Sequence, residues 1–589
     1  MGCGMTELLT AAQMRAVEAA AIASGAVTGL ELMERAGRGV VEAVFAEWPE
    51  LRAGTFRAVV LCGPGGNGGD GFVVARLLKE WGWAVEVFLY GEPEKMPPDA
   101  RVNYERWVGM GEVRGADTFA PWDTDAHLYV DALFGTGLTR PVEGNAAVVA
   151  KALVDSARNH KAQLVAVDVP SGLCSDSGRF LNPEFWLAAD LTVTFQYLKR
   201  GHVLADGPVA SGKVALVDIG LDPKLSRIVL VGKYEPASRR KLDTSPIVRR
   251  IDGYLYTPEF MGTTSILDKG TPGKDGSVHK FSHGHALILS GPPGHGGAAR
   301  LAARGALRIG AGVVSVGCGA EAVAEHAARL DAVMVKVVAG AAGLREVLAD
   351  ARINAVCIGP GLGVDALGAE MVAVVLGSGD GPPPPTPPHA GEGRRDAGAV
   401  GLDATGGGQV IPLPLVGRGA VLRPTVLDAD ALTLLARDAG LFGLLHAGCV
   451  LTPHAGEFAR LFPEIAAKLE APAVKGPAYS KVDACREAAA RAGCVVLFKG
   501  ADTVIASPDG RCAINSAAYE RSAPWLATAG SGDVLAGFIT GLLARGFAPM
   551  QAAETAAWLH VECARSFGPG LIAEDLPEEL PKVFRALGV

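Results

Sequence analysis

Two successive series of short apolar runs, each alternating with amphipathic stretches, constrain the fold more than any other feature of the sequence. The first series extends from Ala58–Cys62 to Val214–Ile219, and the second from Ala286–Leu289 to Gly532–Ala544. Alternation of strand and helix favours a parallel sheet that is covered by helices. A chain of 589 residues is long enough to build two such cores. The sequence therefore predicts the α/β fold class and two domains.

The two series are separated by a segment in which the pattern weakens. Residues 223–276 are polar and punctuated by prolines, which places the domain junction there. We predict a first domain at 8–220, a linker leading into the second domain at 221–278, and a second domain at 279–589. Within the second domain, residues 377–412 contain a proline run and then Gly-rich, charged sequence that cannot bury a core. This part is predicted to be a disordered insertion.

The composition excludes several classes of protein. The formal net charge is −8, so no overall basic surface for a nucleic acid is predicted. No uninterrupted apolar run reaches the roughly 18 residues that span a bilayer, so no membrane partner is predicted. The ten cysteines show no CxxC spacing and are predicted to be reduced thiols, which is typical of a cytoplasmic protein.

A Gly-rich loop follows the first predicted strand of the first series. Gly63, Gly65 and Gly68 match GxGxxG, which by itself is a weak indication of a dinucleotide site. Asn67 and Asp70 add oxygen ligands that a pyrophosphate does not require, and these favour a cation or hydroxyl groups. The alternative is a tight strand-to-helix turn in which the two side chains are caps.

Two further predicted strands end in polar residues. Asp131 precedes another Gly-rich loop, and Asp168 and Ser171 follow the strand Gln163–Val167. Because parallel strands end at the same edge of a sheet, three such strand ends predict one convergent ligand site.

Residues Leu8 to Gly220 resemble the YjeF N-terminal domain, the NAD(P)H-hydrate epimerase family, which has a Rossmann-like parallel sheet. The segments that carry the resemblance are Leu9–Met14, Leu32–Gly37, Gly63–Gly71, Asp131–Gly137 and Asp168–Gly172. The resemblance implies interconversion of the R and S hydrates at carbon 6 of damaged NADH or NADPH. It implies Asp168 as the catalytic acid and base, and a potassium ion at Asn67, Asp131 and Ser171. The implied substrate-binding residues are Gly66, Asn67, Gly68, Gly69, Asp70, Gly135, Thr136, Gly137, Leu138, Thr139, Arg140, Pro141 and Asp168.

A second Gly-rich loop lies near the end of the chain, at Gly530–Gly532, and it is followed by Asp533 and a long apolar stretch. Glycines let backbone N–H groups point at a phosphate, and a helix N-terminus attracts negative charge. Asp533 is then placed to take a proton from an attacking hydroxyl. This pattern predicts phosphoryl transfer, and a capped turn at a buried helix is the alternative.

Residues Ala286 to Leu587 resemble the YjeF C-terminal domain, a ribokinase-like α/β family of ADP- or ATP-dependent NAD(P)H-hydrate dehydratases. The supporting segments are Gly297–Ala302, Arg308–Gly312, Ile358–Gly363, Leu427–Leu432, Leu451–Glu457, Phe498–Thr503 and Gly530–Asp533. The resemblance implies phosphorylation of the S hydrate and elimination of phosphate, with ADP favoured. The implied hydrate contacts are Ala298, Gly363, His454 and the catalytic Asp533. The implied nucleotide contacts are Lys499, Gly500, Ala501, Asp502, Thr503 and Gly532.

Together, the two resemblances lead to the hypothesis of a bifunctional enzyme that repairs hydrated NADH and NADPH. Its substrates are the two hydrates and ADP or ATP, and magnesium is expected to bridge the nucleotide phosphates. The alternative is a small-molecule kinase, of the hydroxymethylpyrimidine or sugar type, whose N-terminal half is a non-catalytic binding module. Association into a homo-oligomer is left open.

Overall fold

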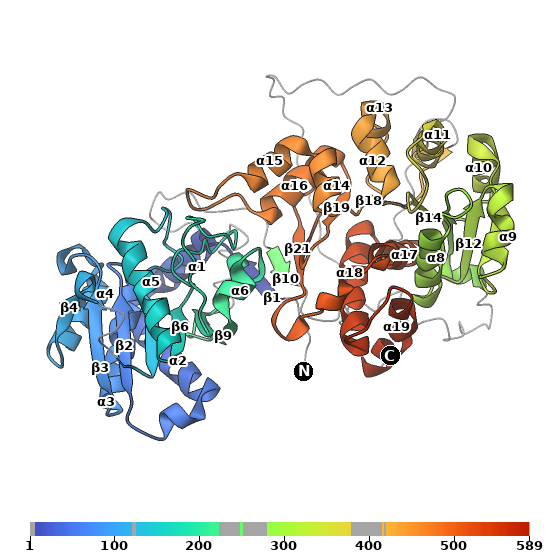
Figure 1. Cartoon of the computed structure of the whole chain (residues 1–589). Helices are drawn as coiled ribbons and strands as arrows, with labels where there is room; N and C mark the ends of the chain where they lie inside the picture. The colour runs from blue at the N-terminus through green and yellow to red at the C-terminus, as the bar shows by residue number, and fades with distance from the viewer. Residues whose placement is uncertain are drawn as a thin grey trace, which may run out of the picture.

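The computed structural model describes residues 6–119, 125–222, 248–250, 280–377, 415–416 and 420–587. Most of the predicted linker at 221–278, and the predicted insertion at 377–412 apart from its first residue, lie outside the described residues. Two large sheets with helices on both faces dominate the described part, as Figure 1 shows. The predicted α/β class is confirmed.

The first sheet has seven parallel strands in the order β4-β3-β2-β5-β6-β7-β9. In chain order these are β2 (Arg57–Cys62), β3 (Ala84–Leu89), β4 (Val113–Gly115), β5 (Leu128–Ala132), β6 (Gln163–Val167), β7 (Leu191–Phe195) and β9 (Lys213–Val217). The order of strands reverses between β2 and β5. The loops that follow these two strands therefore diverge, which opens a crevice at the carboxyl edge of a Rossmann-like sheet.

Helices cover both faces of this sheet because alternate residues of each strand point to opposite sides. Val60 of β2 packs in a cluster with Phe72, while the adjacent Leu61 packs in another cluster with Leu153. The helices are α1 (Ala11–Ala23), α2 (Gly29–Glu47), α3 (Gly66–Glu80), α4 (Pro98–Val108), α5 (Gly144–Asn159) and α6 (Gly207–Ser211).

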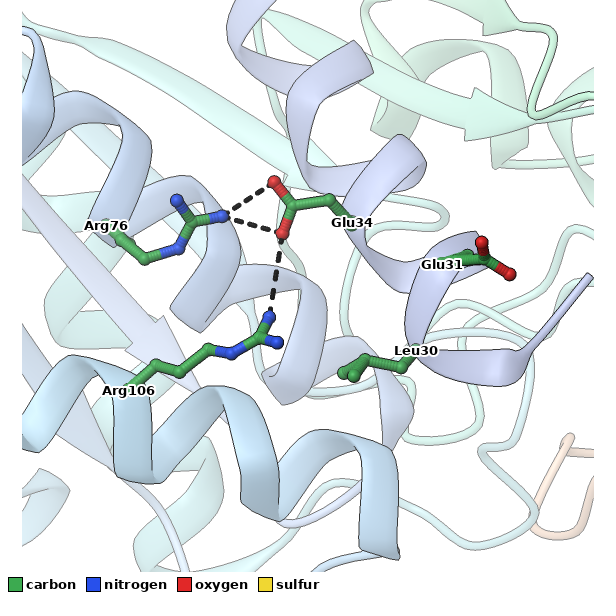
Figure 2. A pocket seen from close by; sticks show the side chains of 5 residues that line it. All are labelled: Leu30, Glu31, Glu34, Arg76 and Arg106. Carbon is green, nitrogen blue, oxygen red and sulfur yellow. Dashed lines mark hydrogen bonds and ion pairs between the residues drawn. The ribbon is translucent and has the colours of Figure 1, made fainter.

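A carboxylate ties together three of the helices on one face. Glu34 of α2 accepts from Arg76 of α3 at 2.6 Å and lies 3.9 Å from the guanidinium of Arg106 on α4. The three side chains line a surface hollow of about 430 Å³ together with Leu30 and Glu31, as Figure 2 shows. The contacts hold α3, whose first turn carries part of the predicted site.

The second sheet has twelve strands in the order β13-β12-β11-β14-β17-β18-β19-β20-β21-β10-β1-β8. Seven of them, from β13 to β19, are parallel, and β20 and β21 follow in antiparallel pairing. Their bounds are β11 (His285–Leu289), β12 (Val313–Cys318), β13 (Met334–Val337), β14 (Ala355–Ile358), β17 (Thr425–Leu427), β18 (Cys449–Leu451), β19 (Val495–Phe498), β20 (Asp502–Ala506) and β21 (Cys512–Ser516). A separate antiparallel pair is formed by β15 (Leu415–Val416) and β16 (Ala420–Val421).

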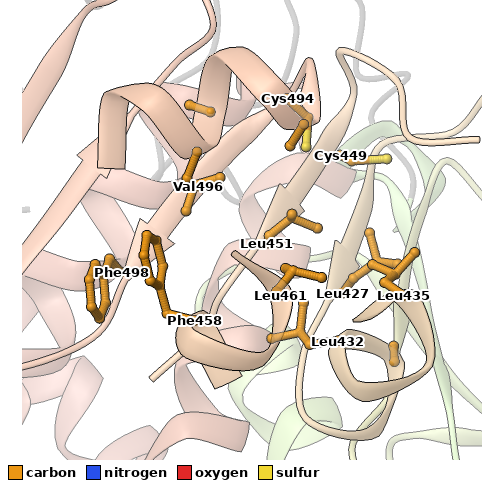
Figure 3. Close-up of a cluster of buried hydrophobic side chains, with 14 of the residues drawn as sticks. Leu427, Leu432, Leu435, Cys449, Leu451, Phe458, Leu461, Cys494, Val496 and Phe498 are labelled. Carbon is orange, nitrogen blue, oxygen red and sulfur yellow. The ribbon is translucent and has the colours of Figure 1, made fainter. Parts of the chain in front are cut away.

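Two hydrophobic clusters sandwich this sheet. One includes Val534 and Phe538 of α17, and the other includes Leu432 and Phe458, which pack on strand residues such as Leu451, as Figure 3 shows. The helices are α8 (Gly297–Arg308), α9 (Val323–Ala327), α10 (Gly340–Leu348), α11 (Ala366–Val375), α12 (Asp430–Arg437), α13 (Ala439–Phe442), α14 (Ala455–Leu461), α15 (Pro463–Glu470), α16 (Lys481–Ala492), α17 (Ser531–Ala544), α18 (Pro549–Phe567) and α19 (Asp575–Ala586). Among the helices of the described residues, none has the length and apolarity of a bilayer span.

Three short strands join the two halves of the molecule. Strand β10 (Val248–Arg250) pairs with β21, β1 (Thr6–Leu9) pairs with β10, and β8 (Leu198–Lys199) pairs with β1. In Figure 1, β1 and β10 lie between the blue-to-teal first half and the orange strand β21 of the second half. The sheet of the second domain is thus completed by β1 and β8, from the first half of the chain, and by β10, from the predicted linker. Strands of two to four residues are too short for apolar periodicity to reveal them.

Candidate active sites

The Gly-rich loop after β2 leads directly into α3, as predicted. A Cβ atom at Gly68 would lie 1.9 Å from the carbonyl oxygen of Gly63, so no larger residue fits there. In contrast, a Cβ at Gly65 or Gly66 would meet no atom within 4 Å. The first turn of α3 therefore presents open backbone at the crevice, where its N–H groups can contact a ligand.

Two of the predicted strand ends are joined by hydrogen bonds. The backbone N–H of Ser171 donates to Asp131 at 2.8 Å, and its hydroxyl donates to the same carboxylate at 2.6 Å. Asp131 is fully buried, and burial raises its pKa to about 6 although these bonds oppose the shift. Nearby, the side-chain oxygen of Asn67 would lie 2.9 Å from a Cβ on Gly135, and Asn67 Nδ2 is buried without a partner.

Asp168 is held by a lysine that the sequence did not single out. Lys199 Nζ donates to Asp168 Oδ1 at 2.6 Å, and the Thr194 hydroxyl donates to the same oxygen at 2.9 Å. Burial opposes ionisation of Asp168, but the charge and hydrogen bond of Lys199 outweigh it and place the pKa below its usual value. His202 Nε2 lies 2.9 Å from the Asp168 carbonyl oxygen. The Asp168 backbone has a φ of +64°, an unusual conformation for a residue with a side chain.

Two further carboxyl groups share this environment. Burial, with added repulsion from Asp168 and Glu18, raises the pKa of Asp70 well above its usual value. Burial also raises the pKa of Glu18 to about 7, while Lys199 opposes the shift. The site thus combines one ionised carboxylate with two carboxyl groups that retain protons more readily, an arrangement suited to acid–base chemistry.

The loop predicted to complete this site, Gly135–Pro141, follows β5. Its Thr136 carbonyl accepts from Arg15 at 3.3 Å. The carbonyl of Thr139 accepts from the backbone N–H of Gly476 in the second domain at 3.0 Å. Leu138 packs on a small apolar cluster contributed by both halves, which contains Cys174, Leu181, Ala473 and Ala478. The second domain therefore helps to fix the loop.

The second site is centred on the N-terminus of α17. Gly530 precedes the helix with a φ of +88°, which a glycine adopts readily. Lys499 lies opposite, because a Cβ on Gly532 would be 3.5 Å from its Nζ. The same ammonium group is 2.9 Å from Asp428 Oδ1 and 3.8 Å from Glu457 Oε2.

The charges around Asp533 suit it to accept a proton. Burial is the largest cause that raises its pKa to about 6, the negative charge of Asp428 adds to the effect, and Lys499 opposes it. A carboxylate with a pKa near 6 is ionised at neutral pH and is still a useful base. The mostly buried Lys499 has a raised pKa, because Asp428 and Glu457 outweigh the effect of burial.

The predicted hydrate contacts lie on separate elements. Ala298 is in the first turn of α8, and the backbone N–H of Gly363 donates to Asp430 at 2.9 Å. His454 is largely exposed and caps α14, where its Nδ1 accepts from the N–H of Gly456 at 3.0 Å.

The predicted nucleotide loop connects β19 to β20. Thr503 donates its hydroxyl to the Gly500 carbonyl at 2.8 Å, which closes the loop. Asp502 accepts from Lys481 Nζ at 2.7 Å and from the Ala205 N–H of the first domain at 3.0 Å.

Several residues of both sites were not predicted as site residues. In the first site they are Glu18, Thr194, Lys199 and His202, and in the second they are Asp428, Glu457 and Lys481. Asp428 follows the apolar run Val426–Leu427, so the strand-end argument applied to the first domain could have indicated it.

Comparisons with known proteins match both halves. Residues 29–201 match the family model of the YjeF-related protein N-terminus, and residues 286–381 and 418–582 match that of NAD(P)H-hydrate dehydratase. The chain is 33% identical to the bifunctional NAD(P)H-hydrate repair enzyme Nnr of Moorella thermoacetica, over 98% of this chain and 97% of that protein. It is 34% identical to the protein of the same name from Salinibacter ruber, over 98% and 96%. An NAD(P)H-hydrate epimerase of Roseobacter litoralis is 48% identical over 37% of this chain and 100% of its own length.

Proposed function

The chain belongs to the family of bifunctional NAD(P)H-hydrate repair enzymes, and we propose which reaction each of its two sites catalyses. The enzyme epimerises the R and S hydrates of NADH and NADPH, and it dehydrates the S hydrate at the expense of a nucleotide. The observation that carries this function is the match of nearly the whole chain to bifunctional relatives. The predicted bifunctional repair activity is confirmed, and the small-molecule kinase is the less supported alternative.

In the first site, the proposed reaction opens the bond between carbon 6 and its hydroxyl and closes it again on the opposite face. A proton must be delivered and removed during this exchange. Asp168, ionised beside Lys199, is the proposed proton acceptor. Asp70 is the proposed proton donor, because its raised pKa keeps a proton close to Asp168. The open backbone at Gly66, with the loop 135–141, is proposed to hold the hydrate.

Asn67, Asp131 and Ser171 fit a potassium ion. The fully buried carboxylate of Asp131 forms no ion pair with a cationic side chain of the described residues, and Ser171 and Asn67 add oxygen ligands. Bound there, the ion would supply positive charge at the carboxyl edge of the sheet. Higher thermal stability in potassium chloride than in choline chloride, abolished by Asp131→Asn, is the expected result. Equal melting temperatures in the two salts would exclude the ion.

In the second site, Asp533 is proposed to take the proton from the hydroxyl of the S hydrate. The hydroxyl oxygen then attacks the terminal phosphorus of the nucleotide, which transfers a phosphoryl group and releases the shortened nucleotide. The bond from carbon to the phosphorylated oxygen breaks next, and phosphate leaves with the bonding electrons. Loss of a proton from the ring restores the dihydronicotinamide. Phosphate leaves far more readily than hydroxide, which is the reason for consuming a nucleotide.

Lys499 and the residues that surround it are proposed to hold the nucleotide. The ammonium group faces the open N-terminus of α17, where amide groups can bind the transferring phosphoryl group. Magnesium on the nucleotide would neutralise phosphate charge, and Asp428 and Glu457 are the carboxylates placed to hold it. We propose ADP as the preferred nucleotide. We also propose a cytoplasmic location, because the described cysteines are buried free thiols.

The test uses the purified protein with a mixture of R and S hydrates plus ADP or ATP. Reduced cofactor and inorganic phosphate should appear in equal amounts until both epimers are consumed. Asp168→Asn should leave the R epimer unconsumed, and Asp533→Asn should stop both products. A stable phosphoester without reduced cofactor would identify a kinase and refute the repair function.

A further inference from the structure

A cavity of about 350 Å³ lies at the junction between the two halves of the molecule. Thr10, Asp176 and Arg200 line it from the first half, and Ser480, Asp483 and Arg486 are among the residues that line it from the second. None of these residues belongs to either site described above. The cavity lies instead on the elements that connect the two sites.

Arg200 is the unusual member of this set. It is only 4% exposed, and its Nε and Nη2 groups are buried without a hydrogen-bond partner. No described carboxylate lies within ion-pair distance of it. A buried and unpaired guanidinium is costly, because the hydration that it loses is not replaced. Its position at the border of a cavity therefore points to a negatively charged partner that occupies the cavity.

The two aspartates of the cavity do not supply that partner. Asp176 Oδ1 accepts from the backbone N–H of Ala11 at 2.7 Å, and Asp483 Oδ2 accepts from the Ser480 N–H at 2.9 Å. Each carboxylate is therefore already engaged by a backbone N–H group, Asp176 by the start of α1 and Asp483 by the N-cap of α16. Burial, the largest cause, and the positive charge of Arg486 lower the pKa of Arg200, and the negative charges of Asp176 and Asp483 oppose this shift without cancelling it.

We propose that this cavity is a binding site for a small phosphate-class oxyanion, either inorganic phosphate or the phosphoryl group of a small phosphate monoester. Two guanidinium groups from opposite sides match the charge and the several acceptor oxygens of a phosphate dianion. The helix-capping residues Thr10 and Ser480 border the same space, with the Ser480 hydroxyl donating to Asp483. The cavity volume of about 350 Å³ is ample for a single phosphate ion.

The position of the cavity gives the anion a structural role. Arg200 directly follows Lys199, which holds Asp168 in the first site. On the other side, Ser480 caps the N-terminus of α16 and Asp483 lies in its first turn, and Lys481 of this helix binds Asp502 in the nucleotide loop. A bound phosphate would therefore join the segment that orients the epimerase carboxylate to the helix that supports the nucleotide loop. Inorganic phosphate, which the proposed function releases, is a natural ligand for this cavity. Its binding can be measured without turnover.

The experiment measures binding to the full-length protein in phosphate-free buffer at constant ionic strength. Calorimetric titration and thermal melting are carried out with inorganic phosphate and, in a second arm, with ribose 5-phosphate. The variant Arg200→Met removes the charge with little change in length. The matched control is Arg179→Met, because Arg179 lies at the same junction, donates to the Ala471 carbonyl and does not line the cavity.

Wild-type protein and Arg179→Met should bind phosphate equally, and Arg200→Met should bind it at least about tenfold more weakly. Without phosphate, Arg200→Met should melt no lower than wild type, because it removes an unpaired buried charge. Tighter binding of ribose 5-phosphate would assign the site to a monoester, and equal or weaker binding would assign it to the free ion. Equal phosphate affinity of Arg200→Met and wild type, or no saturable binding by wild type up to about 10 mM, would overturn the proposal.

Arg200→Lys replaces Arg200→Met if the latter does not fold. It keeps the positive charge and loses the planar fork of donors, so weaker phosphate binding than in wild type is expected. Unchanged affinity in that variant would equally overturn the proposal. Loss of repair activity with intact phosphate binding would instead point to a failure of the proposed function.

Discussion

Acidification should switch off dehydration through a single group, Asp533. Its pKa of about 6 means that at about pH 5 only about a tenth of the protein carries the ionised carboxylate that accepts the hydroxyl proton. The value of kcat/KM for the nucleotide should therefore fall about tenfold between neutral pH and about pH 5, with a slope of one on a logarithmic plot. The restored dihydronicotinamide provides the absorbance signal, with the pure S hydrate as co-substrate.

Two variants should move this acid limb in opposite directions. Asp428→Asn removes a negative charge that raises the pKa of Asp533, so the limb should move to lower pH. Lys499→Met removes a positive charge that lowers the same pKa, so the limb should move to higher pH. Both variants also lose nucleotide contacts, so only the position of the limb is compared, not the maximal rate.

The control is Asp575→Asn, which removes a carboxylate of the same domain that accepts from the backbone N–H of Ile572 and should leave the limb unchanged. Activity must return when the pH is restored, which excludes irreversible acid inactivation, and an unchanged circular dichroism spectrum at about pH 5 must exclude reversible unfolding. A flat profile down to about pH 5, or limbs that shift in the same direction in the two variants, would refute the assignment of Asp533 as the base.

Three further outcomes are expected. Asp168→Asn should slow epimerisation at least about 100-fold, and Lys199→Met should move the acid limb of the epimerisation rate to higher pH, because it removes a charge that lowers the pKa of Asp168. Both effects are measured by separating the R and S hydrates over time. Dehydration of the pure S hydrate should be unchanged in both variants. Gly68→Ala should destabilise the first domain by more than about 2 kcal/mol, because its Cβ would overlap a backbone carbonyl, whereas Gly66→Ala, in open space, should melt within a few degrees of wild type. Burial raises the pKa of Glu554 to about 7, so the folded state binds the proton more tightly than the unfolded state. The free energy of unfolding should therefore fall by about 3 kcal/mol from about pH 4.5 to about pH 7. Denaturant melts at each pH should show that Glu554→Gln lacks this component. Identical pH dependence in Glu554→Gln and wild type would contradict the last prediction.

The strand ends were the most predictable part of the first site. Apolar runs such as Ala58–Cys62 and Leu128–Ala132 become strands almost without change of bounds, and the glycines and aspartates that follow them lie at the carboxyl edge. Lys199 could not be found in this way, because it lies 31 positions beyond Asp168 and is brought back only by the pairing of a two-residue strand. Glu18 is on α1, which is far in sequence from the strand ends, and a carboxylate on a helix usually indicates a solvated face. Tertiary packing, which periodicity does not report, decides both positions.

Strands β10, β1 and β8 belong to the second sheet, and this affects where the protein can be truncated. A truncated protein that begins at residue 279 would retain β21 but not its neighbour β10. The backbone amides and carbonyls on that side of Cys512–Ser516 would then face water beside a row of apolar side chains, an arrangement that promotes edge-to-edge aggregation. The sheet of the carboxy-terminal enzyme is thus closed by strands that lie before it in the sequence, and separating the two activities would leave the edge of β21 exposed.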